Sequence, residues 1–172
     1  MLDRFSSAVR ALHRGCRENV DEGYQAWALE QIKPLLKFDA AFWGTGANVD
    51  GLAVVHTSHR HNLSQESEAL WERHKHEDDS ITSLLCAQGG MVALNHDALC
   101  KTAIYDKCWR HFGINHILAA YLFDAATGLY DAIAFHRYDV AAPFTDAERQ
   151  LADCLAPHLI DTYRRTGLAR SV

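Results

Sequence analysis

Cys108 and His111 are the pair of residues in this sequence whose types and spacing come nearest to a catalytic arrangement. A thiol and an imidazole three residues apart on a helix are neighbours, as a cysteine nucleophile and its base would be. The sequence shows no third group to orient the imidazole and no Gly-x-Ser-x-Gly motif. A buried thiol near a partly exposed histidine explains the pair as well. We therefore predict no catalytic residue and no enzyme, with a small thiol-dependent protein as the alternative.

Histidines gather at His56, His59 and His61, and again at His74 and His76. Imidazole is the commonest transition-metal ligand, but on a strand only His59 and His61 would converge. No cysteine or carboxylate stands at a recognised spacing such as HExxH or CxxC. We predict no metal and no cofactor. A haem-dependent protein is a further alternative, because one axial histidine in an apolar pocket suffices for haem.

Aromatic residues near the edges of the expected strands are the best candidates for a ligand pocket, which needs apolar walls and a few polar groups. The candidates are Trp43, Trp71, Trp109, Phe112, Tyr121 and Phe135. Taken singly, each is more often plain core. Trp71 with Asp79 is a better pair, since a carboxylate beside an indole gives a charged anchor next to an apolar wall. The simpler interpretation of Asp78 and Asp79 is that they cap the next short helix.

Helices and strands that must position these residues follow from the hydrophobic periodicity. Helices are predicted over residues 2–16, 21–35, 64–75, 81–86 (weakly), 95–112 and 145–165. Strands are predicted over residues 38–44, 52–58, 91–94, 116–124 and 129–138. Thr145 and Glu148 form a capping box at the start of the last helix, and Pro157 should kink it. Consecutive strands are mostly close enough to pair antiparallel, which predicts an α+β sandwich around a sheet of about five strands.

Composition limits the class of protein. The 172 residues carry 17 Lys and Arg against 22 Asp and Glu, a formal charge of −5, which suits one ordinary soluble domain and not a surface that wraps phosphate backbones. The five cysteines form no CxxC pair, so we expect reduced thiols and a cytoplasmic location. The longest apolar run, residues 117–123, is far shorter than the roughly 18 residues that cross a bilayer, so we expect no membrane contact.

Five pieces of the sequence, taken in order, resemble a known family. They are Phe38-Asp-Ala-Ala-Phe-Trp-Gly44, the Trp71 helix followed by Asp78-Asp79, Phe112-Gly-Ile-Asn-His116, Ala132-Ile-Ala-Phe-His-Arg137, and Phe144-Thr-Asp-Ala-Glu-Arg-Gln-Leu151 with Ala156-Pro-His-Leu159. Over nearly the whole chain they resemble the N-terminal GAF-like sensory domain of LuxR-type transcription regulators. The resemblance implies a GAF/PAS-like α/β/α sandwich with a five-stranded antiparallel sheet, formed by residues 1–172 as a single domain.

The resemblance also implies a function. Such a domain would bind a small-molecule effector between sheet and helices, often as a homodimer, and relay that state to a helix-turn-helix domain. The helices over 2–16 and 145–165 would serve as the dimer and relay elements. The sequence ends about seven residues after the last predicted helix, so we expect DNA contact only through a domain absent from this chain. A dimerisation module that senses nothing is the remaining alternative.

Acyl-homoserine-lactone receptors of the wider group hold the polar head of the ligand with a Trp, a Tyr and an Asp. Trp71 and Asp78 or Asp79 are the nearest matches here. The Tyr expected one turn after the Trp is missing, because His74 and Lys75 stand there. The resemblance therefore implies a pocket, but an acyl-homoserine lactone is a doubtful occupant.

Overall fold

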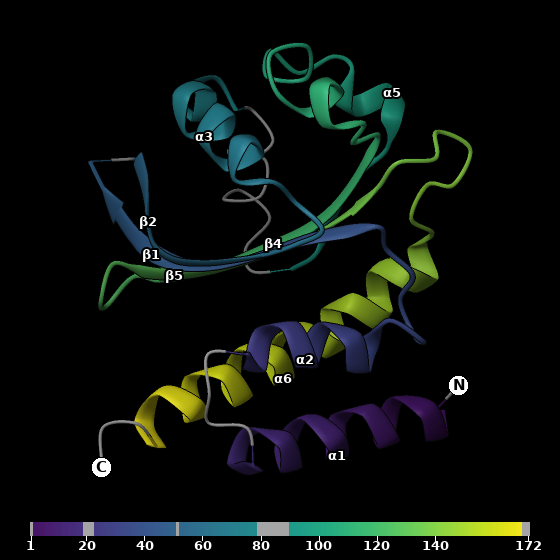
Figure 1. The fold of residues 1–172 in the computed structure, drawn as a ribbon, viewed down its shortest axis with the longest axis vertical. Helices are drawn as coiled ribbons and strands as arrows, with labels where there is room; N and C mark the ends of the chain where they lie inside the picture. The colour runs from purple at the N-terminus through teal and green to yellow at the C-terminus, as the bar shows by residue number, and fades with distance from the viewer. Residues whose placement is uncertain (1, 19–22, 51, 79–89, 170–172) are drawn as a thin grey trace. The chain divides into compact units, whose positions relative to one another are not determined.

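The computed structural model of the chain describes residues 2–18, 23–50, 52–78 and 90–169 (Figure 1). They form two compact units, Met1–Lys37 with Gln150–Val172, and Phe38–Arg149. The expectation of a single domain over residues 1–172 stays a prediction. Among the described helices, none has both the length and the apolar composition that crossing a bilayer requires.

A five-stranded antiparallel sheet forms the framework of the second unit, in the order β2-β1-β5-β4-β3. The strands are β1 (Ala40–Val49), β2 (Leu52–His61), β3 (Val92–Leu94), β4 (His116–Asp124) and β5 (Leu129–Arg137). The two hairpins, β1–β2 and β4–β5, join along β1 and β5, so that Phe42 lies opposite Ala134. The predicted α+β fold with a five-stranded antiparallel sheet is confirmed, although β1 and β2 run several residues further than their patterns indicated.

Helices α3 (Gln65–His74) and α5 (His96–Leu99) lie on the same face of this sheet (Figure 1). Ser64 caps α3, since its hydroxyl accepts a hydrogen bond of 3.2 Å from the backbone N–H of Ser67. Acidic residues in the first turn of α3 suit the positive end of the helix dipole. A short 3-10 helix, η1 (Lys75–Glu77), then leads the chain to Asp78.

The single helix predicted over residues 95–112 is wrong. The chain forms only α5, a series of turns, and the 3-10 helix η2 (Trp109–Phe112), which ends at Gly113 with φ 68°. The reason is tertiary: Leu99 and Tyr105 pack with residues of β4 in one apolar cluster, and the phenol of Tyr105 donates to the side-chain oxygen of Asn115 at 3.1 Å. Burial in this cluster outweighs the helix propensity of the segment. The weak helix predicted over residues 81–86 lies outside the described residues.

The first unit contains α1 (Leu2–Glu18), α2 (Tyr24–Ile32) and most of α6 (Asp146–Ala169). Helix α1 contacts α2 through the phenol of Tyr24, which donates to the backbone oxygen of Leu12 at 3.3 Å. It contacts α6 through His13 and His158, whose ring nitrogens are 3.3 Å apart. Helix α6 continues through Pro157. The helix start predicted at residues 20–21 lies outside the described residues.

The capping box at the start of α6 is confirmed. The hydroxyl of Thr145 accepts from the backbone N–H of Glu148 at 3.2 Å, and the carboxylate of Glu148 accepts from the backbone N–H of Thr145 at 2.9 Å. Glu148 also pairs with Arg137 of β5, whose guanidinium stacks 4.1 Å from the ring centre of Phe144. The predicted Phe-Thr-x-x-Glu motif therefore fixes the start of α6 to the end of β5.

Candidate ligand-binding site

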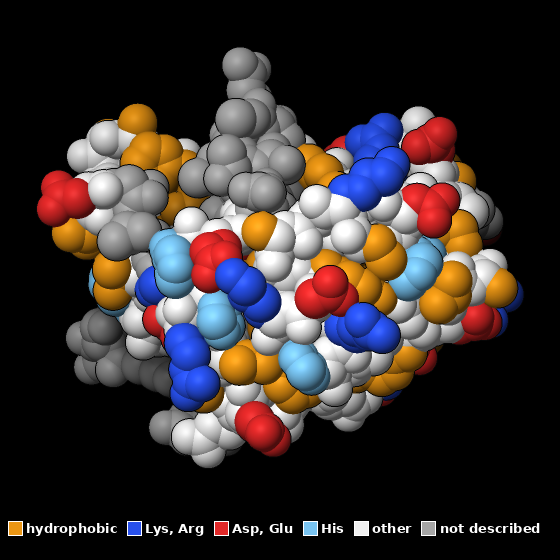
Figure 2. All heavy atoms as spheres, turned by 90° about the horizontal axis from the view of Figure 1, so that it is seen from above, with side chains coloured by type: hydrophobic (Ala, Val, Ile, Leu, Met, Phe, Trp, Pro, Cys, Tyr) orange, Lys and Arg blue, Asp and Glu red, His pale blue; other side chains and the backbone are white. Residues whose placement is uncertain are grey.

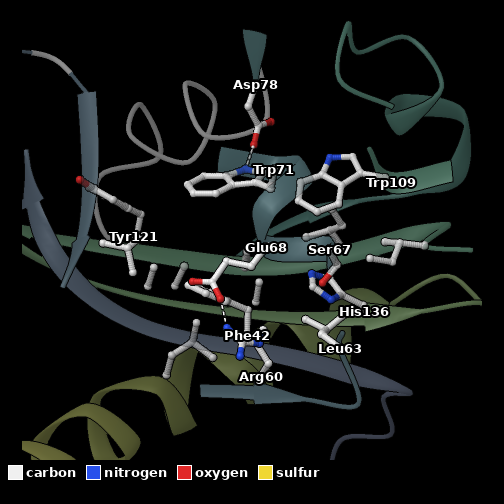
Figure 3. Close-up of a pocket in the computed structure, with 18 of the residues that line it drawn as sticks. Phe42, Arg60, Leu63, Ser67, Glu68, Trp71, Asp78, Trp109, Tyr121 and His136 are labelled. Atoms are coloured by element: carbon white, nitrogen blue, oxygen red, sulfur yellow. Dashed lines mark hydrogen bonds and ion pairs between the residues drawn. The ribbon is translucent and has the colours of Figure 1, made fainter. Parts of the chain in front are cut away.

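A cavity of about 120 Å³ lies within the second unit, between α3, η2 and the face of the sheet that carries α3 (Figure 3). An engineered cavity of about 150 Å³ holds benzene, so this one suits a small ring or a short chain. Its walls are mainly apolar, and side chains from β1, β2, β4 and β5 form its floor. Among the described residues of its lining, Arg60, Glu68 and Asp78 carry charge.

Three of the predicted pocket aromatics, Trp71, Trp109 and Tyr121, line this cavity. Tyr130 of β5 extends the aromatic wall, because its ring stacks on that of Tyr121 with 4.5 Å between centroids. Gly46 on β1 leaves room for this pair: a Cβ at position 46 would stand 2.5 Å from the phenol of Tyr130. The Gly44-Thr-Gly46 segment therefore serves the packing of the wall.

Trp71 and Asp78 form a direct hydrogen bond, with 2.8 Å between the indole nitrogen and Oδ2 (Figure 3). The carboxylate of Asp78 is buried, with 4% of the residue exposed. The sequence paired Trp71 with Asp79, which lies outside the described residues. Because an indole has one N–H, the bond to Asp78 uses the donor of Trp71.

Arg60 of β2 and Glu68 of α3 form an ion pair in the cavity wall. The hydroxyl of Ser58 also donates to Glu68, at 3.0 Å. The two opposite charges largely cancel, so Asp78 accounts for the net charge of the lining. Neither Arg60 nor Glu68 was among the residues that the sequence singled out.

His136, at the end of β5, is the most deeply buried titratable group of the cavity, with 3% of the residue exposed. Burial lowers the pKa of its imidazole to about 4, so the ring is neutral at neutral pH. Its ring centre is 6.2 Å from that of Trp109. Within the described part of the chain, neither His136 Nδ1 nor Trp109 Nε1 has a hydrogen-bond partner, although both atoms are buried.

The other predicted pocket residues lie elsewhere. Trp43 and Phe135 alternate with Phe42, Ala134 and His136 along β1 and β5, so their side chains leave the opposite face of the sheet. Both are buried there, with 0% and 1% exposed. Phe112 packs against the apolar cluster around Leu99 and does not line the cavity.

The strand pattern of residues 130–136 held a signal that our sequence analysis missed. Tyr130, Ala132, Ala134 and His136 share one face, and all four line the cavity. Two alanines between two large polar rings leave space above the sheet, and this alternation could have identified Tyr130 and His136. Phe42, Arg60 and Glu68 gave no comparable signal.

The other candidate chemistry of the sequence finds little support in the geometry. Burial first, and then the charge of Asp78, raises the pKa of the Cys108 thiol to about 12, whereas His111 is exposed. Such a thiol stays protonated and is a poor nucleophile. Among the described residues, no group of three or more His, Cys, Asp or Glu side chains could hold a metal ion.

The face of the molecule seen in Figure 2 carries side chains of both charges close together. Among the described residues, ion pairs such as Lys75 with Glu72 and Arg110 with Asp106 bring opposite charges together. A surface that binds phosphate backbones needs clustered positive charge, and this face does not present it among the residues described.

No protein-family model and no curated protein matches this sequence. Solved structures do. CepR2 of Burkholderia cenocepacia, an N-acylhomoserine-lactone-dependent LuxR family transcription factor, matches with a TM-score of 0.64 and 14% identity over 94% of both chains. SdiA of Escherichia coli matches with a TM-score of 0.70 and 15% identity, over 95% of this chain and 69% of that one.

A phycoerythrobilin-bound GAF domain from a cyanobacterial phytochrome also matches, with a TM-score of 0.61 and 11% identity over 96% of this chain and 97% of that one. At these identities the likeness shows the fold. The chain therefore has the fold that LuxR-family ligand-binding domains share with GAF domains, as the sequence resemblance implied.

Proposed function

We propose that this chain, which has the fold of LuxR-family ligand-binding domains, is a cytoplasmic small-molecule-sensing domain of a LuxR-type transcription regulator. The observation that carries the proposal is the cavity beneath α3, which has aromatic walls and two buried nitrogens without partners in the described structure. In a core that binds no ligand, side chains normally fill a cavity of this kind, and buried polar nitrogens normally have hydrogen-bond partners. Trp71, Trp109 and Tyr121, with Phe42, Tyr130 and His136, are the residues that we propose contact the effector.

Sensing would work by a shift of population. An effector that binds one arrangement of the chain more tightly than another favours that arrangement, typically by a coupling free energy of about 1–3 kcal/mol. The relay would end at a helix-turn-helix domain, attached or in a partner protein, which alone contacts DNA. Asp79, Trp43, Phe112 and Phe135 stay predicted site residues from the sequence, and the proposed cavity does not require them.

The size of the cavity favours a small effector. About 120 Å³ is well below the roughly 300–1,000 Å³ of pockets that hold drug-sized ligands. CepR2 is described as dependent on an N-acylhomoserine lactone, and SdiA has been solved with octanoyl-rac-glycerol. The Trp71–Asp78 bond and the missing tyrosine make a homoserine lactone a poor candidate here, and haem would need far more space.

Mass spectrometry of the purified protein under native and then denaturing conditions, with an absorption scan, tests the proposal. We expect a small molecule that is lost on denaturation, or a thermal shift with a screened effector, and no Soret band. Ala134→Leu would fill the cavity, whereas Ala93→Leu on β3 adds the same volume at an exposed position. Loss of the ligand in Ala134→Leu alone supports the site. Equal ligand binding in both variants would place the ligand outside this cavity, and no ligand at all would favour the module that only dimerises.

A homodimer is part of the proposal, with α1 and α6 as its contact elements. Leu12, Leu155 and Leu159 are buried within the single chain and so cannot face a partner. Phe5, Val9 and Leu151 are only partly buried and Leu2 is exposed, so these apolar side chains are available for such a contact. Light scattering of the purified chain, with Val9→Glu as the disrupting variant, measures the oligomeric state directly.

A further inference from the structure

The polar groups that line the cavity differ in how fully their hydrogen bonds are used. Trp71 donates its N–H to Asp78, and Glu68 accepts from both Arg60 and Ser58. The hydroxyl of Ser67 donates to the backbone oxygen of Ser64 at 2.6 Å. These groups already bond to other protein groups. A ligand could hydrogen-bond to their donors only if it first broke these bonds.

Trp109 Nε1 and His136 Nδ1 differ from these groups, since both are buried and neither has a partner within the described residues. A buried polar atom without a partner costs about 1–3 kcal/mol, and native structures contain few of them. Their rings lie together, with centroids 6.2 Å apart, at one end of the cavity, and Tyr121 lies at the other end (Figure 3). The two nitrogens without described partners therefore lie at one end of the cavity, and the phenol of Tyr121 lies at the other.

We propose that Trp109 and His136 form the site for the polar end of the effector, and that the effector is an uncharged molecule with a carbonyl or hydroxyl oxygen at one end and an apolar body. This inference rests on the proposed function and names the chemistry of its ligand. The indole of Trp109 can only donate, so the effector supplies an acceptor to it. The imidazole of His136 donates or accepts at Nδ1 according to its tautomer, so a hydroxyl or a carbonyl satisfies it.

The charges around the cavity exclude the ionised alternatives. Asp78 gives the lining its net negative charge, and an anion placed beside this buried carboxylate would lose its hydration and gain repulsion. A cation at this end of the cavity would meet the N–H of Trp109, which offers no acceptor.

Four probes of similar size test the inference: benzyl alcohol, its oxygen-free isostere ethylbenzene, benzoate and benzylammonium. Dissociation constants for the purified chain would be measured by NMR titration, with Trp109→Phe and His136→Leu as test variants and Trp27→Phe, at a residue that does not line the cavity, as the matched control. Each test variant removes a polar nitrogen and keeps a bulky apolar side chain. The ratio of the ethylbenzene constant to the benzyl alcohol constant isolates the contribution of the hydroxyl, in the manner of a double-mutant cycle.

We expect the ratio to fall about three- to tenfold in Trp109→Phe and in His136→Leu, because each loses one neutral hydrogen bond, and to stay within twofold in Trp27→Phe. Benzyl alcohol should bind the wild-type chain more tightly than benzoate or benzylammonium does. An unchanged ratio in both test variants, or an equal fall in Trp27→Phe, would overturn the inference and leave the sensing cavity standing. Tighter binding of either ion would overturn the ligand class. Failure of every probe to bind the wild-type chain would overturn the proposed function as well.

Discussion

The indole nitrogen of Trp71 and the carboxylate of Asp78 are 2.8 Å apart, across the turn between α3 and the end of η1. The bond connects Asp78, at the end of η1, to helix α3, which covers the cavity. Because the only N–H of the indole donates to Asp78, Trp71 offers the cavity an apolar surface. The residue that most resembles the ligand anchor of lactone receptors therefore has a structural partner in this chain.

Removal of this hydrogen bond should destabilise the protein. A bond to a buried carboxylate contributes about 1.5–3 kcal/mol, so we expect Trp71→Phe and Asp78→Ala each to lower the free energy of unfolding by at least this amount. The double variant should lose little more than the worse single variant, since the bond can be lost only once. Urea unfolding of the four proteins measures this coupling. Fully additive losses would show that the two residues act independently.

Acid should destabilise the protein through His136. Its pKa is lowered from 6.5 to about 4 by burial, so below pH 6.5 the unfolded chain takes up a proton that the folded chain refuses. Stability should therefore fall as the pH drops from about 6.5 to about 4, by roughly 3 kcal/mol from this group, and this contribution should level off below pH 4. Unfolding of the wild type and of His136→Leu at several pH values tests this.

His56 offers the matched control, because it is an exposed histidine on β2. His56→Gln should keep the wild-type pH dependence, whereas His136→Leu should flatten it between pH 4 and 6.5. The same slope in all three proteins would mean that His136 gains its proton without a cost in the folded state.

Cysteine labelling should separate the buried from the exposed thiols. Burial and the nearby charge of Asp78 raise the pKa of Cys108 to about 12, whereas Cys100 and Cys154 are exposed. We expect iodoacetamide at pH 8 to modify Cys100 and Cys154 in the native protein and to reach Cys108 only after denaturation. Peptide mass spectrometry gives the extent at each site. Rapid native labelling of Cys108 would revive the thiol-dependent alternative.

A methyl group at position 46 should damage the cavity. A Cβ there would stand 2.1 Å from the backbone oxygen of Val54 and 2.5 Å from the Tyr130 phenol, so strand β2 or the ring must move. We expect Gly46→Ala to cost about 1–3 kcal/mol of stability and to weaken effector binding. Gly23→Ala, at a position where none of the described residues comes within 4 Å of the added carbon, should stay within about 0.5 kcal/mol of the wild type in a thermal melt.

Local signals explain why much of the fold could be predicted. The Thr145–Glu148 capping box, the Ser64 start of α3 and the β4–β5 hairpin each depend on residues close in the chain, so their patterns survive in the sequence. The segment after Asn95 could not be predicted this way. Its helical spacing is real, but Leu99 and Tyr105 are buried against residues of β4, and that burial outweighs local propensity.

The residues of the candidate site also fall into two groups: those that local sequence patterns predicted and those that only tertiary packing brought together. The sequence by itself determined which residues are large, aromatic and adjacent to strands, and so it found Trp71, Trp109 and Tyr121. Only the tertiary structure decided which face of the sheet holds the cavity, which leaves Trp43 and Phe135 on the other face. It also brought Trp109 and His136 together from segments far apart in the chain, with 6.2 Å between their ring centres. Side-chain alternation along a strand is a local property, but the face that stays unfilled depends on what packs above it, and no local pattern encodes that.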